Sequence, residues 1–378
     1  MKLLVAGARL QGTEAIYLAK KAGYYVIAVD IDPDAPGSSL ADEFFCADIN
    51  EYREMALILK KADMIIPALE NLSTLRSLQD YSRRFNIPFI FDMDAYLISR
   101  SKKKSNKLFR ELKLSLPEAY PACSFPVIIK PDSKSGSEKV FKAYSKEEAV
   151  RIFEEYPDEN FVIQEFLDGP SYSLEVIGDG KNFFFPQITQ VITDEDYDCS
   201  RIIAPAAVSG QIREQMLETG RRLAGRLKIK GIFDIEVIED KGTLRLLEID
   251  ARLPSQTPVS VYHSKQVNMV KLLVEIFSGK NPEIPHPDRE RCCLYQQILV
   301  EGAEIYMAGE HIMADAGHLR LIENFFGADE VITDYTEGAP CWRAIVIICK
   351  DSRKEAFCAF DNFINEIKTN VCTAAAVV

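Results

Sequence analysis

Several classes of protein are excluded by what this sequence lacks. Its 378 residues contain no apolar run near the roughly 18 residues that cross a bilayer as a helix. The nine cysteines form no CxxC pair and the four histidines show no metal-ligand spacing, which argues against a zinc site and favours a reducing cytoplasm. The apolar start, MKLLVAGARLQG, meets a glycine-rich turn at once, so we expect a strand there and no signal peptide.

Positive charge is also scarce. Lys and Arg number 45 against 57 Asp and Glu, which gives a net charge of -12. We therefore expect neither a nucleic-acid-binding nor a membrane-binding surface, and an anionic substrate would need local basic groups. Hydrophobic residues make up 47% of the chain, which is enough for a packed core, and the length suggests more than one domain.

The first part of the chain alternates strands and helices. The segment KLLVA is typical of a buried strand, GARLQG of a turn, and the residues that follow predict a helix over 13–22 and a strand over 24–32. This β-α-β pattern predicts a parallel sheet. Further along we expect a basic helix over 99–116, strands within 125–180, a helix over 210–226, a hairpin over 231–251, a helix over 264–279 and a mixed α/β piece beyond 290.

The hairpin carries an unusual set of acids. In a strand, alternate residues share a face, so Asp234 lies beside Glu236, and Glu248 beside Asp250. If residues 241–243 form the turn, Glu236 faces Glu248 and Asp234 faces Asp250. Like charges about 5 Å apart repel, so such a cluster needs cations or protons. Hard oxygen ligands suit Mg²⁺, although a solvated acidic face would show the same pattern.

Two other segments have the composition of a nucleotide site. In FPVIIKPDSKSGSEKV a strand presents Lys130 and then enters a Ser/Gly loop over 133–137. Such a loop can fold over phosphates, while a lysine supplies positive charge. In FVIQEFLDGPSYSLEVI a strand runs into a hinge that could offer backbone groups to an adenine edge. Each segment alone is equally compatible with an ordinary turn.

Taken in order, these motifs resemble the ATP-grasp superfamily. The similarity rests on the basic helix, Lys130, the hinge, Glu236 and the segment LLEIDAR. It implies an ATP-grasp fold of the α/β class with an N-terminal Rossmann-like domain. On that basis we expect this domain at 1–95, a helical linker and lid subdomain at 96–185, and a C-terminal subdomain at 186–378. The implied activity is ATP-dependent joining of a carboxylate to an amine through an acyl phosphate.

The resemblance also implies roles for individual residues. Glu236, Glu248 and Asp250 would bind Mg²⁺, with two ions expected; the superfamily usually has Asn at the last position. Lys130 and Arg252 would act on the phosphates, and a second lysine of the basic helix would be Lys104 in preference to Lys102. The residues expected to bind ATP are Lys104, Lys130, Ser135, Gly136, Ser137, Gln164, Glu165, Phe166 and Leu167.

Within the superfamily, the opening segment and EIDARLPSQTPVSVYHSKQVNMVKLL are similar to the amino-acid ligases of pyrrolysine biosynthesis. That similarity implies 3-methylornithine as acyl donor, the ε-amine of L-lysine as acceptor, and a homodimer. Acidic residues near the hinge could hold ammonium groups, and an arginine fork could hold a carboxylate. The carboxyl ends of the N-terminal strands are where open α/β sheets bind ligands. Candidate substrate residues are Leu10, Gln11, Leu72, Asp168, Ser173, Glu175, Arg201 and Arg252.

Three alternatives remain open. An NAD-dependent oxidoreductase would explain VAGARLQG followed by Asp30, but Arg9 stands where the middle glycine of G-x-G-x-x-G is needed. A non-catalytic binding protein on the same scaffold would have no use for the acids of the hairpin together with Lys130 and Arg252. An ATP-grasp ligase for another amino-acid pair would share every motif named above.

Overall fold

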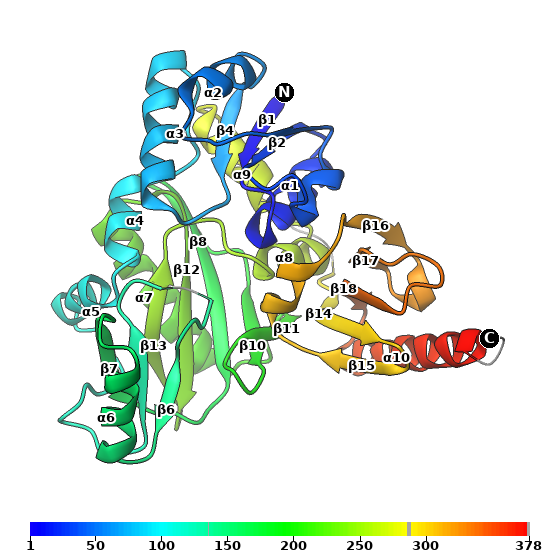
Figure 1. Cartoon of the computed structure of the whole chain (residues 1–378). Coiled ribbons are helices and arrows are strands. Elements are labelled where there is room, and N and C mark those ends of the chain that lie inside the picture. Colours follow the sequence, from blue (N-terminus) through cyan, green and yellow to red (C-terminus); the bar gives the residue numbers. More distant parts are fainter. Residues whose placement is uncertain (135, 286–288, 376–378) are drawn as a thin grey trace. The chain divides into compact units, whose positions relative to one another are not determined.

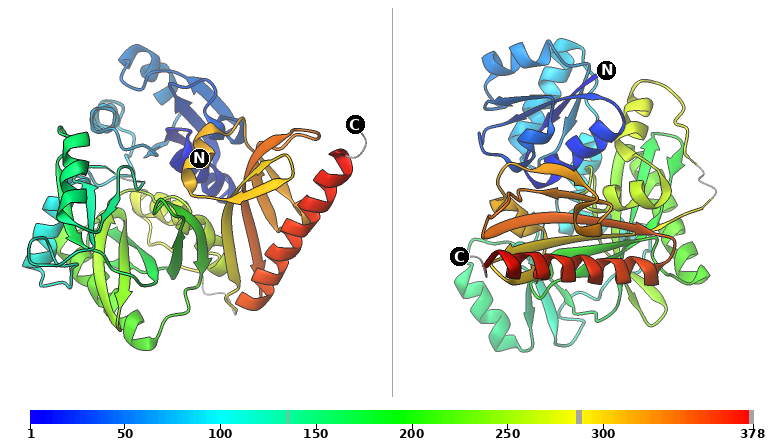
Figure 2. Two further views of the ribbon diagram at one scale, coloured as in Figure 1. Left: turned by 60° about the horizontal axis from the view of Figure 1, so that its bottom comes forward. Right: turned by 90° about the vertical axis from the view of Figure 1, so that its right-hand side faces the viewer.

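The computed structural model describes residues 1–134, 136–285 and 289–375. The chain forms two compact units. The first unit comprises Met1–Phe91, Ser200–Pro205 and Leu253–Val378, and the second comprises Asp92–Cys199 and Ala206–Arg252. Figures 1 and 2 show their helices and strands. The division at residues 95 and 185 stays a prediction. Within the described part of the chain, no helix has both the length and the apolar character needed to cross a membrane.

The N-terminal part of the first unit is a parallel sheet of order β3-β2-β1-β4. The predicted β-α-β pattern is confirmed, although the first helix starts at Leu10, three residues earlier than expected. The elements are β1 (Lys2–Ala6), α1 (Leu10–Lys21), β2 (Tyr25–Asp30), η1 (Pro36–Leu40), β3 (Glu43–Cys46), α2 (Tyr52–Leu59), β4 (Met64–Pro67) and α3 (Leu72–Phe85).

The C-terminal part of the first unit is antiparallel. Strand β14 pairs with β11, β15 and β18, and β17 lies between β18 and β16. Helix α10 packs against β14 and β18 (Figure 2). The elements are β11 (Cys199–Ala204), α8 (Thr257–Lys265), α9 (Met269–Phe277), β14 (Cys292–Glu301), β15 (Glu304–Met307), η2 (Glu310–Asp315), β16 (Arg320–Glu323), η3 (Phe325–Gly327), β17 (Glu330–Thr333), β18 (Cys341–Lys350) and α10 (Arg353–Ala375).

The single helix predicted over 264–279 is wrong. Gln266 ends α8 with a φ of 59°, a left-handed conformation that stops a helix. The Asn268 side chain then accepts a hydrogen bond from the Lys271 N–H and caps a new helix, α9. Apolar periodicity continues across the break, so the pattern alone did not reveal it.

The second unit contains two antiparallel sheets. The smaller has the order β6-β5-β7, and the larger contains β13-β12-β8-β10, with β9 beside β8. The elements are α4 (Met93–Ser99), α5 (Lys102–Glu111), β5 (Val127–Pro131), β6 (Phe141–Ala143), α6 (Lys146–Glu155), β7 (Phe161–Glu165), β8 (Ser171–Asp179), β9 (Phe183–Phe184), β10 (Ile188–Thr193), α7 (Gly210–Leu227), β12 (Lys230–Asp240) and β13 (Thr243–Asp250).

The hairpin of β12 and β13 has the predicted pairing of acids but a different turn. Asp240 pairs with Thr243, so only Lys241 and Gly242 form the turn, both with positive φ as a type I′ turn requires. A β-bulge after Glu236 then shifts the register by one residue. The prediction of a three-residue turn was therefore wrong, and the bulge supplies the residue that restores the pairing.

Burial explains why the acids of the hairpin share one face. Phe233, Ile235 and Ile249 are fully buried on the other face. Gly220 of α7 lies close to Ile235, so that helix covers the apolar side. The alternation of strand residues leaves the acids on the side away from α7.

The first turn of the N-terminal sheet gives a test of packing. A Cβ at Gly12 would lie 2.1 Å from the Gly7 carbonyl oxygen. We expect Gly12→Ala to lower the free energy of unfolding by about 2–4 kcal/mol. Gly225→Ala is the matched control, because that helical glycine has open space around it, and it should be neutral or stabilising by up to about 1 kcal/mol. Urea unfolding followed by circular dichroism measures both, and equal midpoints would contradict the packing argument.

Candidate active site

Carboxylates from three adjacent strands meet in the second unit. Asp234 of β12 lies between Glu175 of β8 and Asp250 of β13. The next acid along β12, Glu236, lies between Ser173 and Glu248. Glu175 and Asp234 are buried. We call Glu175, Asp234, Glu236, Glu248 and Asp250 the acidic cluster.

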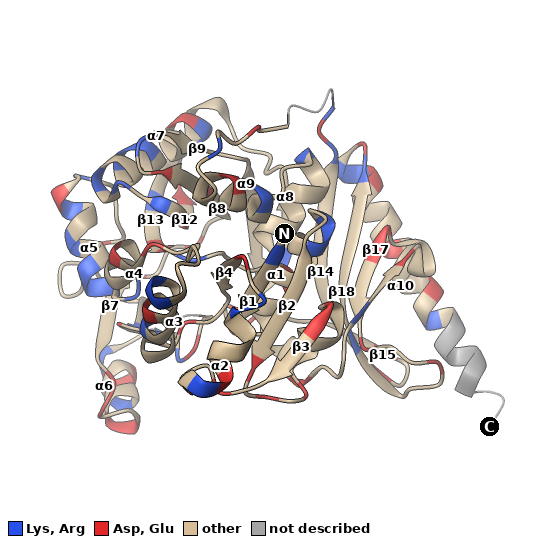
Figure 3. Cartoon of the chain, turned by 90° about the horizontal axis from the view of Figure 1, so that it is seen from above, with Lys and Arg blue, Asp and Glu red and all other residues tan. Residues whose placement is uncertain are grey.

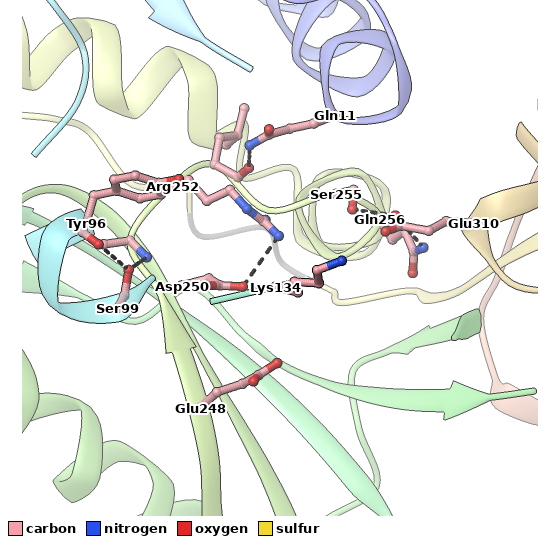
Figure 4. A network of polar contacts seen from close by, with 12 residues as sticks. Gln11, Tyr96, Ser99, Lys134, Glu248, Asp250, Arg252, Ser255, Gln256 and Glu310 are labelled. Atoms are coloured by element: carbon pink, nitrogen blue, oxygen red, sulfur yellow. Dashed lines mark hydrogen bonds and ion pairs between the residues drawn. The ribbon is translucent and has the colours of Figure 1, made fainter. Parts of the chain in front are cut away.

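Basic side chains surround part of this cluster. The Nζ atoms of Lys102 and Lys130 lie 3.4 and 3.6 Å from the Glu248 Oε2. Arg252 Nη2 lies 3.4 Å from the Asp250 Oδ2 (Figure 4). These cations come from α5, from β5 and from the segment after β13, so three separate elements must fold together before the acids are neutralised.

Helix α4 fixes the end of β13. The Ala251 N–H donates to the Ser99 hydroxyl over 3.0 Å, and that hydroxyl donates to the Tyr96 carbonyl. Figure 4 shows Ser99 and Tyr96 beside this strand end. Ala251 lies between Asp250 and Arg252 in the chain, so the contact holds the backbone from which both side chains project.

The carboxyl groups of the acidic cluster differ in how readily they ionise. Burial and the neighbouring Glu248 raise the pKa of Glu236 to about 8. Burial and Asp250 likewise raise the pKa of Asp234 well above its usual range. Burial opposes ionisation of Glu248 too, but Lys102 and Lys130 outweigh it and lower its pKa to about 2. The site therefore contains one firmly ionised carboxylate, Glu248, and two, Asp234 and Glu236, that ionise readily only beside additional positive charge.

These residues fit a magnesium ion. The donors are carboxylate oxygens on strands, the hard ligands that Mg²⁺ prefers. The Asp234 Oδ1 is buried and has no hydrogen-bond donor among the described residues. Clustered acids with raised pKa values are stabilised when a cation binds between them.

A cavity of about 270 Å³ adjoins the cluster within the second unit. Lys102, Lys130, Glu236 and Glu248 line one part of it, and the hinge 164–169 lines another. The Phe166 N–H donates to the Pro126 carbonyl. Among the described residues, the Leu167 N–H has no acceptor, so the hinge leaves one backbone donor for a ligand in a largely apolar recess.

Comparisons with known proteins agree with this geometry. The family model for an ATP-grasp domain matches residues 99–256, and that for a PylC-like N-terminal domain matches residues 3–90. The 3-methyl-D-ornithine–L-lysine ligase of Methanosarcina mazei is 36% identical over 314 residues, covering 82% of each chain. That of Methanosarcina acetivorans is 35% identical, covering 82% of this chain and 84% of its own.

The chain belongs to the ATP-grasp ligases. Solved structures support the same fold. The L-amino acid ligase from Bacillus licheniformis has a TM-score of 0.71 at 16% identity, covering 97% of each chain. An ADP complex of N5-carboxyaminoimidazole ribonucleotide synthetase has a TM-score of 0.75 at 13% identity, also covering 97% of each chain. The predicted fold and enzyme class are confirmed.

The preference for Lys104 is corrected by the structure. Lys104 is exposed, and its Nζ donates to the Leu97 carbonyl. Lys102 is the lysine that lines the cavity and contacts Glu248. Ser101 caps α5 by accepting from the Lys104 N–H, and its hydroxyl contacts Asp132. That tertiary contact orients the helix, which a run of three lysines could not reveal.

The other residues predicted to bind nucleotide in this ATP-grasp ligase lie in the second unit. Gln164, Glu165, Phe166 and Leu167 line the cavity with Ser137, whose hydroxyl donates to the Tyr197 carbonyl over 2.7 Å. Asp168, which was predicted to bind substrate, lines the same cavity. Gly136 has a φ of 60° in the same loop but is not among the lining residues. Ser135 lies outside the described residues. Sequence reasoning missed the walls contributed by Tyr172, Val191, Thr193, Tyr197 and Ile238.

Some predicted substrate residues belong to the first unit. Leu10 and Gln11 line a hollow of about 510 Å³ at the carboxyl ends of the parallel strands. Leu72 begins α3 and is not among its lining residues, although Leu69 and Thr74 are. Asp30 also lines the hollow, but its carboxylate accepts hydrogen bonds from the backbone N–H groups of Ala8 and Asp32. This bonding argues against its use on the ribose of a dinucleotide.

Arg201 is engaged in packing. Its Nε donates to the Gln296 side chain over 2.6 Å. The guanidinium lies over the rings of Phe357 and Phe360 of α10, with 5.4 and 5.0 Å to the ring centroids. Burial lowers its pKa. Its role in holding a carboxylate stays a prediction.

Glu14, which lies near Leu10 in the first unit, predicts a pH dependence of stability that can be measured. Burial raises its pKa to about 8, and its carboxyl accepts from the Gln256 N–H and the Tyr295 hydroxyl. The folded protein therefore holds a proton that the unfolded chain releases near pH 4.5, so stability is lost as pH rises from about 4.5 to about 8. We expect Glu14→Gln to remove up to about 5 kcal/mol of this loss.

Thermal and urea unfolding of wild type and variant across that pH window measures the effect. Glu304→Gln, an exposed acid of the same unit, is the matched control and should leave the wild-type slope unchanged. Parallel curves for wild type and Glu14→Gln would show that Glu14 does not hold the proton.

Proposed function

We propose that this ligase joins the carboxylate of 3-methylornithine to the ε-amine of L-lysine, converting ATP to ADP and phosphate. The observation that carries the ligase chemistry is the acidic cluster facing Lys102 and Lys130 beside the cavity. The choice of substrates is supported by relatives named for this reaction at 35–36% identity over most of the chain. The reaction supplies an amide-linked product for pyrrolysine biosynthesis.

The cavity of the second unit is proposed to bind ATP. The apolar walls and the Leu167 N–H would receive the adenine, and Lys102 and Lys130 would lie on the phosphates. Glu236, Glu248 and Asp250 would hold two Mg²⁺ ions, which neutralise triphosphate charge when bound. Phosphoryl transfer depends mainly on positioning and charge neutralisation. Lys130 and Arg252 are proposed as the catalytic cations of this chain.

The substrate carboxylate must first be converted to an acyl phosphate, because a free carboxylate is a poor acylating agent. Water would destroy that intermediate, so the site needs a cover. The loop around Gly136 and Ser137 is proposed as this cover, held by the contact with Tyr197. The attacking amine must lose a proton, which acidic neighbours in a desolvated pocket can accept.

The remaining assignments concern the amino acids. Asp168 and Glu175 are proposed to hold ammonium groups of the acyl donor, with Ser173 beside Glu175 at 3.4 Å. Leu10 and Gln11, which line the hollow of the first unit, are proposed to bind lysine together with Leu72, and Arg201 is proposed to bind a carboxylate. We further propose a cytoplasmic location from the unpaired cysteines. A homodimer stays a prediction from the resemblance.

The choice between the two lysines of α5 is directly testable. We expect Lys102→Met to weaken binding of MgADP about 10- to 100-fold, because a charged contact to phosphate is lost. Lys104→Met is the matched control, with the same loss of charge two residues away on the exposed side of α5. Isothermal titration calorimetry measures both. A larger loss for Lys104→Met would restore the original assignment.

Removing one carboxylate tests the proposed chemistry. We expect Glu248→Gln to reduce ADP release by at least about 100-fold, because it removes a proposed ligand and the partner of two lysines. Glu239→Gln, the same change on β12 outside the acidic cluster, should keep nearly full activity. The assay contains ATP, Mg²⁺, 3-methylornithine and lysine, with product detected by mass spectrometry.

The same assay identifies the substrates. A product mass equal to 3-methylornithine plus lysine less water supports the proposed pair, and turnover only with other amino acids favours the alternative ligase. Binding of nucleotide without turnover for any pair would indicate a regulatory protein. Near-wild-type turnover by Glu248→Gln would count against the metal assignment.

A further inference from the structure

Two buried cysteines face each other in the first unit. Cys293 of β14 and Cys349 of β18 are directly opposite in the antiparallel ladder. Their exposed fractions are 0% and 1%, and as directly opposed residues both side chains lie on the same face of the sheet. The ligase chemistry proposed for the second unit uses neither thiol.

The backbone around Cys349 shows which kind of strand pair this is. Its N–H donates to the Asp329 Oδ2 over 2.8 Å, and its carbonyl accepts from Arg291 Nη2. Neither group is therefore exchanged with Cys293, so the two residues form a non-hydrogen-bonded pair. In such pairs the Cα atoms are about 4.5 Å apart and side chains lie close together. That spacing falls within the about 4.4–6.8 Å that disulfides bridge.

A hydrogen-bonded chain leads from a carboxylate to this thiol pair. Glu330 Oε1 forms an ion pair with Lys21 Nζ at 2.7 Å. Its Oε2 accepts the hydroxyl proton of Tyr17 over 2.7 Å. Tyr17 has no second proton to give, so the 2.6 Å contact with His263 Nε2 requires the imidazole to donate. This leaves Nδ1 as the nitrogen of the His263 ring that can accept a proton, and His263 lies near enough to Cys349 to lower its pKa.

The same contacts favour the Cys349 thiolate. Cys293 and, to a lesser extent, His263 lower the pKa of Cys349 to about 6, against the opposing effects of burial and the nearby Asp329. Burial raises the pKa of Cys293 well above its usual range. One thiol is thus prepared as a nucleophile, and its neighbour stays protonated beside it.

We propose that Cys293 and Cys349 form a redox-active dithiol, activated by His263, which a small peroxide oxidises to a cross-strand disulfide. The Cys349 thiolate attacks one peroxide oxygen, the O–O bond breaks, and the leaving hydroxide takes the His263 proton to become water. Cys349 is then a sulfenic acid. The Cys293 sulfur attacks it, the S–O bond breaks, and the departing hydroxide takes the Cys293 proton. Two thiols lose two electrons, and one peroxide becomes two waters.

Oxidation would change how α8 is held. His263 lies on α8, and its bond to Cys349 connects that helix to the sheet formed by β14 and β18. A disulfide sulfur is a much weaker partner for the imidazole than a thiolate. The disulfide therefore replaces an anchor of α8 with a covalent link between two strands that are already adjacent.

Peptide mapping after peroxide treatment tests the proposal. The protein is exposed to hydrogen peroxide, denatured in iodoacetamide and digested. We expect a linked peptide pair containing Cys293 and Cys349, lighter than the two reduced peptides by two hydrogen atoms and cleaved by dithiothreitol. Cys292→Ser, a buried neighbour on the opposite face of β14, should keep this link. Cys293→Ser and Cys349→Ser should lose it.

The rate of disulfide formation tests the role of His263 separately. We expect His263→Gln to slow formation of the disulfide at least about tenfold, since the thiolate loses its proton acceptor. Circular dichroism verifies that this variant is folded. Exclusive oxidation of the exposed Cys46, Cys341 and Cys358, or a wild-type rate in His263→Gln, would overturn the proposal. Ligase activity is not part of either measurement, so failure of the proposed function would leave this test intact.

Discussion

The site depends on repulsion between carboxylates that the fold holds together. Strand pairing sets Glu236 opposite Glu248 and Asp234 opposite Asp250, a spacing at which like charges destabilise a sheet. Lys102 and Lys130 lie against Glu248, and Arg252 lies against Asp250. The raised pKa values of Asp234 and Glu236 show that these two carboxyl groups lack such compensation. Binding of a cation between the carboxylates would remove this repulsion and stabilise the folded protein. A metal-dependent ligase is therefore the function that best explains the cluster.

Positive charge is concentrated on α5 although the chain as a whole is acidic. The chain is acidic overall, with a net charge of -12, yet Figure 3 shows Lys and Arg gathered along α5. Of the lysines at the start of that helix, Lys102 is the one that faces the acids. A nucleotide therefore meets positive charge on one wall of the cavity and carboxylates that can bind a metal on another.

Features governed by strand alternation could be predicted from the sequence, and those governed by tertiary contacts could not. The pairing of the acids could be predicted because side chains alternate between the two faces of a strand. The bulge after Glu236 has no sequence signal. It offsets the two-residue turn, so the predicted pairing is present although the predicted turn was wrong. Lys102 and Lys104 point about 200° apart on a helix, and tertiary contacts such as that of Ser101 with Asp132 set which one faces inward. The hinge was predictable because its strand and turn are contiguous in the chain.

The surroundings of the thiol pair could not be predicted from the sequence either, because they too depend on tertiary contacts. Tyr17, His263, Glu330 and Cys349 come from four elements and are brought together only by the folded first unit. Each has an ordinary explanation in sequence: a core tyrosine, a helix-end histidine, a surface acid and a strand cysteine. In the structure, the Tyr17 hydroxyl donates to Glu330, so the His263 Nε2 must donate to Tyr17. The proposed activation of Cys349 therefore depends on four side chains that only the fold brings together, a property that no residue of the four has alone.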